Sequence, residues 1–389
     1  MRKGWKYKKL GEVCEVVTGT TPKTNIPEYW GKGHYWVTPA ELNDTTVYID
    51  KTERQITDEA LSKTKLRLLP VGTVLLSSRA PIGKVAIANA EMYCNQGFKN
   101  CICSETIYNK YLFYFLRLKK DYLNSLGRGA TFKEISKSIV ESIKIPLPPK
   151  STQLAIVSEL DKINELIRLK KEQLKDFDNL AQSLFYEMFG DPVENEKGWE
   201  VKKLGDICTD ITDGDHMPPP KSEFGIPFIT ISDIDKDTRC LNFENTFYVP
   251  EDYYNNLKEN RKPQKGDLLY TVTGSYGIPV IVKTDKKFCF QRHIALLRPN
   301  KEILSTIFLC YWVLSDGVKF MADKVATGIA QKTVGLNSIR KFSCILPPLP
   351  LQHLFAQRIE QIERETSEVQ KSIQDLDTLL ASRMQYWFE

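Results

Sequence analysis

Two long stretches of the chain carry apolar residues at the spacing of a helical seam. They run from Ser151 to Phe189 and from Leu351 to Glu389, and neither contains Gly or Pro. The apolar positions alternate in steps of four and three, which is the heptad pattern of a coiled coil. The seam positions are Ile156, Leu160, Ile163, Ile167, Lys170, Leu174, Phe177, Ala181, Leu184 and Met188, then Phe355, Ile359, Ile362, Thr366, Val369, Ile373, Leu376, Leu380, Arg383 and Trp387. Each helix would be about 57 Å long at about 1.5 Å per residue.

Some residues depart from these stripes. Lys170, Thr366 and Arg383 place polar groups in the seam, where such groups often set the register, although near a helix end they could simply be exposed. Conversely, some apolar residues lie off the seam, namely Leu154, Leu166, Leu169 and Phe185. They predict a surface that another protein covers. The alternative is that they pack on the rest of the chain.

The two bodies between these stretches follow a different pattern. Short apolar runs, separated by Gly, Pro and Asn, are typical of strands and turns. They read GTVLLSS, VAIAN, IPFITI, DLLYTV and IPVIV. Weaker helical patterns occur at 107–124 and 302–322. Each body is therefore predicted to be a mixed α/β module.

The sequence also contains an internal repeat, in which four landmarks recur in the same order at an offset of about 195 residues. GWKYKKLGEV at Gly4 recurs as GWEVKKLGDI at Gly198, and VGTVLLSSRAPIG at Val71 recurs as KGDLLYTVTGSYG at Lys265. GATFKEIS at 129 and PPKSTQ at 148 recur as GIAQKTVG at 328 and PPLPLQ at 347. Such a repeat is too long for a solenoid unit and indicates a duplicated domain.

The expected fold is α+β, with two tandem mixed α/β domains separated by two long helices that form an antiparallel coiled coil. The segments are 1–150, 151–190, 191–350 and 351–389. We expect the two copies to be related by a pseudo-twofold axis, because each module is followed by its own helix.

Charge is distributed unevenly between these segments. The chain has 54 Lys and Arg against 49 Asp and Glu, a net charge of +5. Residues 1–150 hold 24 basic and 14 acidic residues, a net of +10, whereas 151–197 hold 6 and 10, a net of −4. Residues 198–350 are at +2 and 351–389 at −3. A polyanion would be drawn to the modules rather than to the helices, although a solvated surface is an adequate alternative for the second module.

Several classes of chemistry have no motif in the sequence. There is no GxxxxGK[ST] loop, no GxGxxG after a strand, no [DN]PP[YF] and no HExxH. The nine cysteines include no CxxC, and the four histidines show no metal-ligand spacing, so we expect no zinc site. No apolar stretch is long enough to span a membrane, and the N-terminus lacks a signal-peptide core. We therefore expect a cytoplasmic protein without a catalytic site of its own.

These features together resemble one family, the specificity (S) subunit of Type I restriction–modification enzymes. The resemblance covers essentially the whole chain. Besides the two module openings, it rests on TGTTPKTNIPEYWG, TDGDHMPPPKSEFGIPFITISDI, IPLPPKSTQLAIVSELDKI and ILPPLPLQHLFAQRIEQI. No single string is decisive, but their order and duplication are specific.

The resemblance implies a function and a set of partners. Each module would be a target recognition domain that reads one half of a bipartite site in double-stranded DNA. The long helices would form the spacer and dock methyltransferase (M) subunits, of which two are expected. Restriction (R) subunits remain open as further partners. No cofactor is expected on this chain, since S-adenosylmethionine would belong to the methyltransferase.

DNA-contacting residues are expected on loops, because phosphate contacts position a protein and base-edge contacts specify the sequence. In the first module the candidates are Thr20, Thr21, Lys23, Arg79, Lys84, Gln96, Lys99, Arg128 and Lys133. In the second they are His216, Lys221, Thr273, Ser275, Tyr276, Gln291, Arg292, Gln331 and Lys332. Loop positions that differ between two copies of one scaffold are where two different half-sites could be read.

Structural roles are the alternative for several of these residues. Thr20 and Thr21 precede Pro22 and could be plain turn residues, and Arg79 could pair with a carboxylate. His216 could cap a turn, and Tyr276, like Phe132, could belong to the core. Trp5 and Trp199 stand at equivalent places in the repeat and are interpreted as packing residues, while Gly129 and Gly328 are assigned to backbone turns.

Two other functions compete with DNA specificity. The chain could be a DNA methyltransferase or nuclease with an unrecognised site, which binding of S-adenosylmethionine to the purified chain would reveal. It could also be a scaffold whose modules bind proteins. Salt-dependent DNA affinity separates that case, because phosphate contacts release counterions.

Overall fold

The computed structural model describes residues 5–79, 81–129, 133–214, 216, 219–328 and 331–389. The chain divides into two compact units, which we call unit 1 and unit 2. Unit 1 comprises Met1–Lys171 and Lys371–Glu389, and unit 2 comprises Glu172–Gln370. Both long helices contribute to both units, so neither unit ends where its body meets a helix. Within the described ranges, no helix has the length and apolarity needed to cross a membrane.

Unit 1 is built on a five-stranded sheet in the order β2-β9-β6-β7-β4, a three-stranded sheet in the order β5-β3-β8, and the antiparallel pair β1-β10. The strands are β1 (Lys6–Lys9), β2 (Cys14–Thr18), β3 (Trp30–Val37), β4 (Tyr48–Ile49), β5 (Gln55–Ile56), β6 (Val74–Leu76), β7 (Val85–Ala88), β8 (Tyr93–Cys94), β9 (Lys99–Cys103) and β10 (Lys144–Leu147). The helices are α1 (Leu10–Val13), α2 (Asp58–Lys63), α3 (Asn109–Leu118), α4 (Lys120–Ser125) and α5 (Lys137–Ser142), with 3-10 turns at Pro27–Tyr29 and Pro39–Glu41.

Unit 2 has a four-stranded sheet in the order β12-β20-β17-β18, a three-stranded sheet in the order β16-β13-β19, and the pairs β11-β21 and β14-β15. The strands are β11 (Glu200–Lys203), β12 (Cys208–Asp213), β13 (Ile226–Ile229), β14 (Ile234–Asp235), β15 (Cys240–Leu241), β16 (Phe247–Val249), β17 (Leu268–Thr271), β18 (Pro279–Ile281), β19 (Cys289–Phe290), β20 (Ile294–Pro299) and β21 (Ser343–Leu346). The helices are α7 (Leu204–Ile207), α8 (Glu251–Asn255), α9 (Thr306–Leu314), α10 (Asp316–Val325) and α11 (Leu336–Arg340), with 3-10 turns at Ile231–Asp233 and Glu259–Arg261.

The two bodies share one topology, which confirms the duplication. β2, β9, β6 and β7 correspond in order to β12, β20, β17 and β18. Each small sheet has a central strand with one antiparallel and one parallel neighbour, β3 in unit 1 and β13 in unit 2. The copies differ at one edge: β4 extends the main sheet of unit 1, whereas unit 2 has the separate hairpin β14-β15. The expected apolar runs are the strands β6, β7, β13, β17 and β18.

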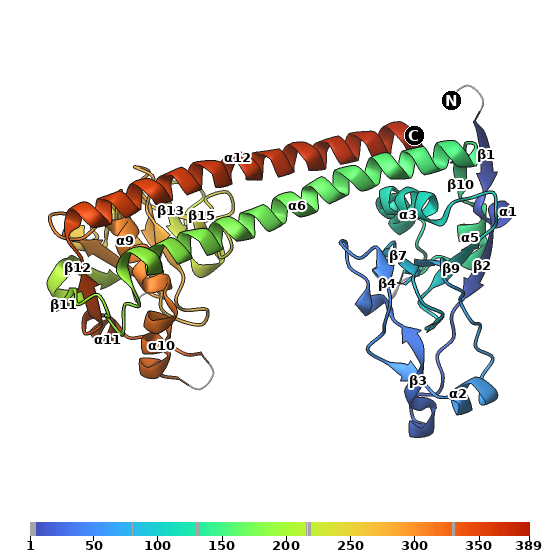
Figure 1. The fold of residues 1–389 in the computed structure, drawn as a ribbon, viewed down its shortest axis with the longest axis horizontal. Helices are drawn as coiled ribbons and strands as arrows, with labels where there is room; N and C mark the ends of the chain where they lie inside the picture. Colours follow the sequence, from blue (N-terminus) through green and yellow to red (C-terminus); the bar gives the residue numbers. More distant parts are fainter. Residues whose placement is uncertain (1–4, 80, 130–132, 215, 217–218, 329–330) are drawn as a thin grey trace. The chain divides into compact units, whose positions relative to one another are not determined.

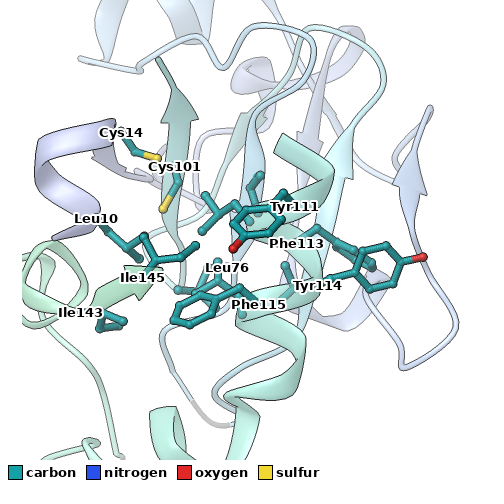
Figure 2. Packing of buried hydrophobic residues seen from close by; sticks show 14 of the residues in the cluster. Leu10, Cys14, Leu76, Cys101, Tyr111, Phe113, Tyr114, Phe115, Ile143 and Ile145 are labelled. Atoms are coloured by element: carbon teal, nitrogen blue, oxygen red, sulfur yellow. The ribbon is translucent and has the colours of Figure 1, made fainter. Parts of the chain in front are cut away.

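One of the buried clusters of unit 1 packs α3 against the main sheet. The sequence of α3, NKYLFYFLRL, is apolar over consecutive positions, and its residues from Tyr111 to Leu116 are all buried. Figure 2 shows Tyr111 and Phe115 close to Leu76 of β6, while Tyr114 is turned away from them. In unit 2 the equivalent helix α9 packs in the same way, with Phe308 and Trp312 fully buried. The sequence of α9, TIFLCYWVL, is apolar on nearly every face, which is typical of a buried helix.

The long helices are α6 (Lys150–Phe189) and α12 (Leu349–Phe388). In unit 1 the start of α6 meets the end of α12, since Ile156 lies in one buried cluster with Phe388. In unit 2 the end of α6 meets the start of α12, where Ala181 lies in one cluster with Ile359. The helices are therefore antiparallel within each unit (Figure 1), as predicted. Every seam position is buried or half-buried, which confirms the heptad pattern.

The ends of the helices follow from local sequence. Pro350 lies in the first turn of α12, where its missing N–H costs nothing. Gly190 ends α6 with a φ of +77°, and its N–H donates to the Tyr186 carbonyl at 2.8 Å. This is the left-handed cap that glycine adopts without strain.

One expectation about the helix surface is wrong. Phe185 is buried, with its ring 5.2 Å from that of Phe189 and 5.6 Å from that of Phe308. It packs on the body of unit 2, because the face of α6 that meets α9 is wider than the heptad seam. Leu154, Leu166 and Leu169, by contrast, are 46–48% exposed.

Candidate nucleic-acid interface

In unit 1, the loop after β2 and the segment before β9 form one side of the candidate site. The Thr20 N–H donates to the Cys94 carbonyl at 2.9 Å, and the Thr21 hydroxyl donates to the side-chain oxygen of Gln96. This approach is possible only with Gly19, because a side chain there would collide with the Asn95 carbonyl. Two candidates far apart in sequence, Thr21 and Gln96, are thereby brought into contact.

Arg79 and Lys99 meet at a residue that the sequence did not single out, Glu134. Its carboxylate accepts from Arg79 Nε at 2.9 Å and from Lys99 Nζ at 3.0 Å. Burial raises the pKa of Glu134, but the hydrogen bonds from Lys99 and Arg79 outweigh it, so the pKa lies below its ordinary value. The side chain of Arg79 is 45% exposed and that of Lys99 only 7%, which favours a supporting role for Lys99 over direct contact with DNA.

The backbone around this group is equally well fixed. Glu134 forms isolated β-bridges with both Arg79 and Arg128. The Ile135 N–H donates to the Ser78 carbonyl at 3.0 Å, and the Ser78 N–H donates to the Gly97 carbonyl at 2.7 Å. Four separate segments therefore form one edge, to which Thr21, Gln96, Arg79, Lys99 and Arg128 contribute. Residues 130–132, which lie between the candidates Arg128 and Lys133 and include Phe132, are outside the described residues.

Unit 2 builds the same edge from different side chains. Thr333 bridges both Thr273 and Thr327, the counterparts of Arg79 and Arg128. The hydroxyls of Thr333 and Thr273 are 3.2 Å apart. A side chain at Gly214 would collide with the Phe290 carbonyl, just as one at Gly19 would collide with Asn95.

Further candidates in unit 2 surround this edge. The Gln291 N–H donates to the Ile229 carbonyl at 3.0 Å, and the Gly274 N–H donates to the Lys332 carbonyl at 3.0 Å. The side chains of Arg292, Ser275, Gln331 and Lys332 are exposed. Burial, followed by the charge of Arg292, lowers the pKa of His293. A lysine that the sequence did not single out, Lys236, donates to the Ser275 hydroxyl at 3.1 Å.

Several candidates have visible structural partners. Lys84 is half-buried, and its ammonium donates to the Pro39 carbonyl at 3.2 Å. The Tyr276 hydroxyl donates to Asp323 at 2.5 Å, and this hydrogen bond raises the pKa of Tyr276. His216 lies 3.0 Å from Asp213, and the Lys221 ammonium lies 5.0 Å from the Phe247 ring. Lys23 and Lys133 are exposed.

Trp5 and Trp199 both take packing positions. Trp5 stacks on Trp387 at a ring distance of 6.2 Å, and the Trp199 indole N–H donates to the Phe189 carbonyl at 2.8 Å. The two residues pack against the cores of units 1 and 2 respectively.

The chemistry of both edges suits binding. Among the residues that the structure describes, no three His, Cys, Asp or Glu side chains cluster as metal ligands. Burial raises the pKa of Cys94, Cys208, Cys289 and Cys310 to about 12, which makes these thiols poor nucleophiles at neutral pH. The edges offer guanidinium, ammonium, amide and hydroxyl groups on loops, which are the groups that contact phosphates and base edges.

Comparison with known proteins identifies relatives over the whole chain. The sequence profile described as "Type I restriction modification DNA specificity domain" matches twice, at residues 2–176 and 196–376. The specificity subunit of the type I restriction enzyme MjaIX from Methanocaldococcus jannaschii is 30% identical, over 95% of this chain and 89% of its own length. The EcoKI specificity subunit of Escherichia coli is 23% identical over 95% of this chain and 84% of its own.

Solved structures share the fold. A chain from a study of complex assembly and conformational transition of the type I R-M system covers 99% of this chain and 97% of its own, with a TM-score of 0.67 at 20% identity. The S subunit of a type I restriction–modification system from M. genitalium covers 100% and 98%, with a TM-score of 0.52 at 14% identity.

Proposed function

Because this chain belongs to the family of type I restriction–modification DNA specificity subunits, we propose that each of its units reads one half of a bipartite site in double-stranded DNA. The observation that carries this proposal is the edge built twice on one scaffold. In unit 1 the bridged positions are Arg79, Glu134 and Arg128, and in unit 2 they are Thr273, Thr333 and Thr327. The same backbone thus carries Arg, Glu and Arg in unit 1 and three threonines in unit 2, of which Thr273 is buried, and this difference in side chains suits two different half-sites.

The chain supplies specificity, and its partners supply the chemistry. Methyltransferase subunits, two for one S subunit, bind S-adenosylmethionine and modify the DNA, and restriction subunits join the complex where cleavage occurs. The chain itself has no catalytic site and binds no cofactor. The assembly works in the cytoplasm.

The proposed surface for a methyltransferase lies on α6 in unit 1. Leu154 and Leu166 are 47% and 48% exposed, and they line a groove of about 650 Å³ with Tyr108, Val157 and Lys162. Exposed apolar residues that gather around one groove are typical of a surface that binds another protein. Asp161, at the same groove, is held by Lys110 at 2.8 Å and by the Tyr114 hydroxyl at 2.6 Å, so the groove has a rigid wall.

Methylome sequencing tests the proposal. A host that expresses the chain together with its methyltransferase should carry methylation at one bipartite motif, and a host that expresses the methyltransferase alone should not. The purified chain alone should show no binding of S-adenosylmethionine in calorimetry. Methylation that is independent of the chain, or tight cofactor binding by the chain alone, would contradict the proposal.

A further inference from the structure

The carboxylate of Glu134 holds one edge of the Arg79 guanidinium. It accepts from Nε at 2.9 Å, while among the residues with a described position no acceptor contacts the two terminal nitrogens. A guanidinium has five N–H donors in one plane. The hydrogen bond at Nε fixes the plane of the Arg79 guanidinium. The N–H groups of its two terminal nitrogens then form a two-pronged donor, the Arg79 fork, on a side chain that is 45% exposed.

Glu134 is itself held by three other residues. Its carboxylate therefore has a fixed position, which in turn fixes the Arg79 guanidinium. Its backbone is bridged to Arg79 and Arg128, and the hydrogen bonds to Arg128 are 2.9 and 3.0 Å long. Its second carboxylate oxygen accepts from Lys99, which is almost fully buried and also lies 3.4 Å from the Ser78 hydroxyl. Rigid support of this kind is what a specific contact needs, because a loosely held side chain adapts to any base.

The charges of this group leave it attractive to DNA. Two cations and one carboxylate give a local charge of +1, so Glu134 orders Arg79 without cancelling it. A planar guanidinium fork matches the O6 and N7 acceptors of guanine in the major groove. An ammonium is a point charge without this geometry, so it would distinguish guanine from a phosphate less well.

We infer that Glu134 is a positioning residue that presents the Arg79 fork to a guanine in the half-site read by unit 1. This inference rests on the proposed function. At the equivalent place unit 2 has Thr333 against Thr273, which carries no cation. The fork therefore has no counterpart at this position of unit 2, where Thr273 is buried and its hydroxyl is engaged by Thr333.

The test uses the complex of the full chain with its methyltransferase and DNA in which each position of the target is varied in turn. Glu134→Asp keeps the charge but withdraws the carboxylate by one methylene. It should reduce the preference for guanine at one position about tenfold or more, and leave the salt dependence of binding unchanged. Glu134→Gln retains an acceptor for Nε but leaves Lys99 without its counterion, so it should give a smaller loss at the same position. Glu91→Gln, at an exposed position of the same unit, should change nothing.

The outcomes separate cleanly. If Glu134→Asp weakens all sequences alike, or leaves every base preference intact, Glu134 does not position a reader and the inference is wrong. If the complex of the Glu134→Asp variant melts at a lower temperature than the wild type, its loss of preference could come from instability. The variants Glu134→Gln and Arg79→Lys then test the inference, which requires that both lose preference at the same guanine. If the wild-type complex shows no sequence preference at all, the proposed function fails before this inference is reached.

Discussion

Gln153 and Gln352 make the same three hydrogen bonds at the bases of the two long helices. The Tyr108 N–H donates to the Gln153 side chain at 2.8 Å, and that side chain donates to the carbonyls of Thr106 and Pro148 at 3.0 and 2.9 Å. Gln352 is bonded in the same way to Ser305, Ile303 and Pro347, at 2.9, 3.0 and 2.8 Å. Both side chains are fully buried. Each glutamine side chain thus connects a long helix to the body that precedes it, because it forms hydrogen bonds with buried backbone groups that water cannot reach.

Replacing either glutamine should therefore loosen one unit. Gln153→Ala leaves one N–H and two carbonyls without a partner, which should cost about 1–3 kcal/mol of stability. Hydrogen exchange should speed up in α3 and β10, with α9 and β21 unchanged, and Gln352→Ala should do the reverse. The exposed Gln374 provides the control, since Gln374→Ala should stay within about 0.5 kcal/mol of wild type. Equal acceleration in both units would contradict this role.

A second contact joins α6 and α12 in unit 1 and should respond to pH. Arg383 donates to both carboxylate oxygens of Glu159, and the Trp387 indole donates to one of them at 3.0 Å. The hydrogen bond from Arg383 lowers the pKa of Glu159 below its ordinary value of 4.5; burial opposes this effect and the bond from Trp387 adds to it. A lowered folded-state pKa means that the stabilisation is complete above pH 4.5 and is lost as the pH falls through the folded value.

Glu159→Gln removes this contribution. At neutral pH the variant should be less stable than wild type by up to about 1 kcal/mol, because the pair is one-third exposed. The difference should shrink towards zero as the pH falls below 4.5, which thermal unfolding at a series of pH values measures. Glu91→Gln serves as the control, and a difference that grows with acidity would refute the assignment.

Much of this fold could be predicted from the sequence, because its signals are periodic or repeated. The heptad steps from Ile156 to Met188 gave the helix and its buried face, and the offset between the copies gave the duplication. Phe185 was misassigned, since a seam pattern describes the contact of a helix with one partner and α6 has two. In the middle of α12, Thr366 occupies a seam position and donates its hydroxyl to the Ile362 carbonyl at 2.8 Å, a pairing that periodicity does not reveal.

The candidate site was only partly accessible from sequence. Glycines such as Gly19 and Gly214 mark the close approach of two loops, but only the folded chain shows which loops meet. Glu134 was missed because an acidic residue is not expected beside DNA. The repeat did contain a clue to Glu134. It aligns with Thr333 at the offset of 199 residues, so the two copies differ in charge at this position within a segment that is otherwise recognisable as repeated.

The groove on α6 should bind the methyltransferase through its leucines. Leu154 and Leu166 are about half exposed, so covering the remainder is worth about 1 kcal/mol each. The double variant Leu154→Ser, Leu166→Ser should bind the methyltransferase about thirtyfold more weakly in calorimetry. Leu68→Ser, which changes an exposed leucine of unit 1 that does not line the groove, should bind normally. Unchanged affinity in the double variant would place the partner elsewhere.

Arg79 and Lys332 should affect DNA binding in different ways. Arg79→Ala should relax one position of one half-site by roughly ten- to a hundredfold, because a bidentate base contact is worth about 1–3 kcal/mol. Lys332 is exposed, and as a phosphate contact its loss in Lys332→Ala should weaken all sequences alike and reduce the salt slope by about one. Binding curves on single-base variants at several salt concentrations distinguish the two. A uniform effect of Arg79→Ala would make that residue a phosphate contact instead.

The independence of the two half-sites can be tested by exchanging one module, and the structure shows where to cut. Replacing residues 1–150 by those of a relative removes Trp5 and Tyr111 but keeps their partners on α12. Those partners are Trp387, stacked at 6.2 Å on Trp5, and Phe388, whose ring lies 5.0 Å from that of Tyr111. An exchange that also includes 151–171 and 371–389 transfers the whole of unit 1 with its buried cluster.

Both exchanges should replace one half of the methylated motif and keep the other, because each unit has its own core and its own loop edge. The shorter exchange should unfold at a lower temperature than the longer one, since its aromatic contacts come from two different parents. Methylome sequencing gives the motifs, and thermal unfolding of the purified complexes gives the order of stability. If either exchange altered both half-sites together, the two edges would not read DNA independently, and the charged and hydroxyl versions of the bridge would have to act on one shared sequence.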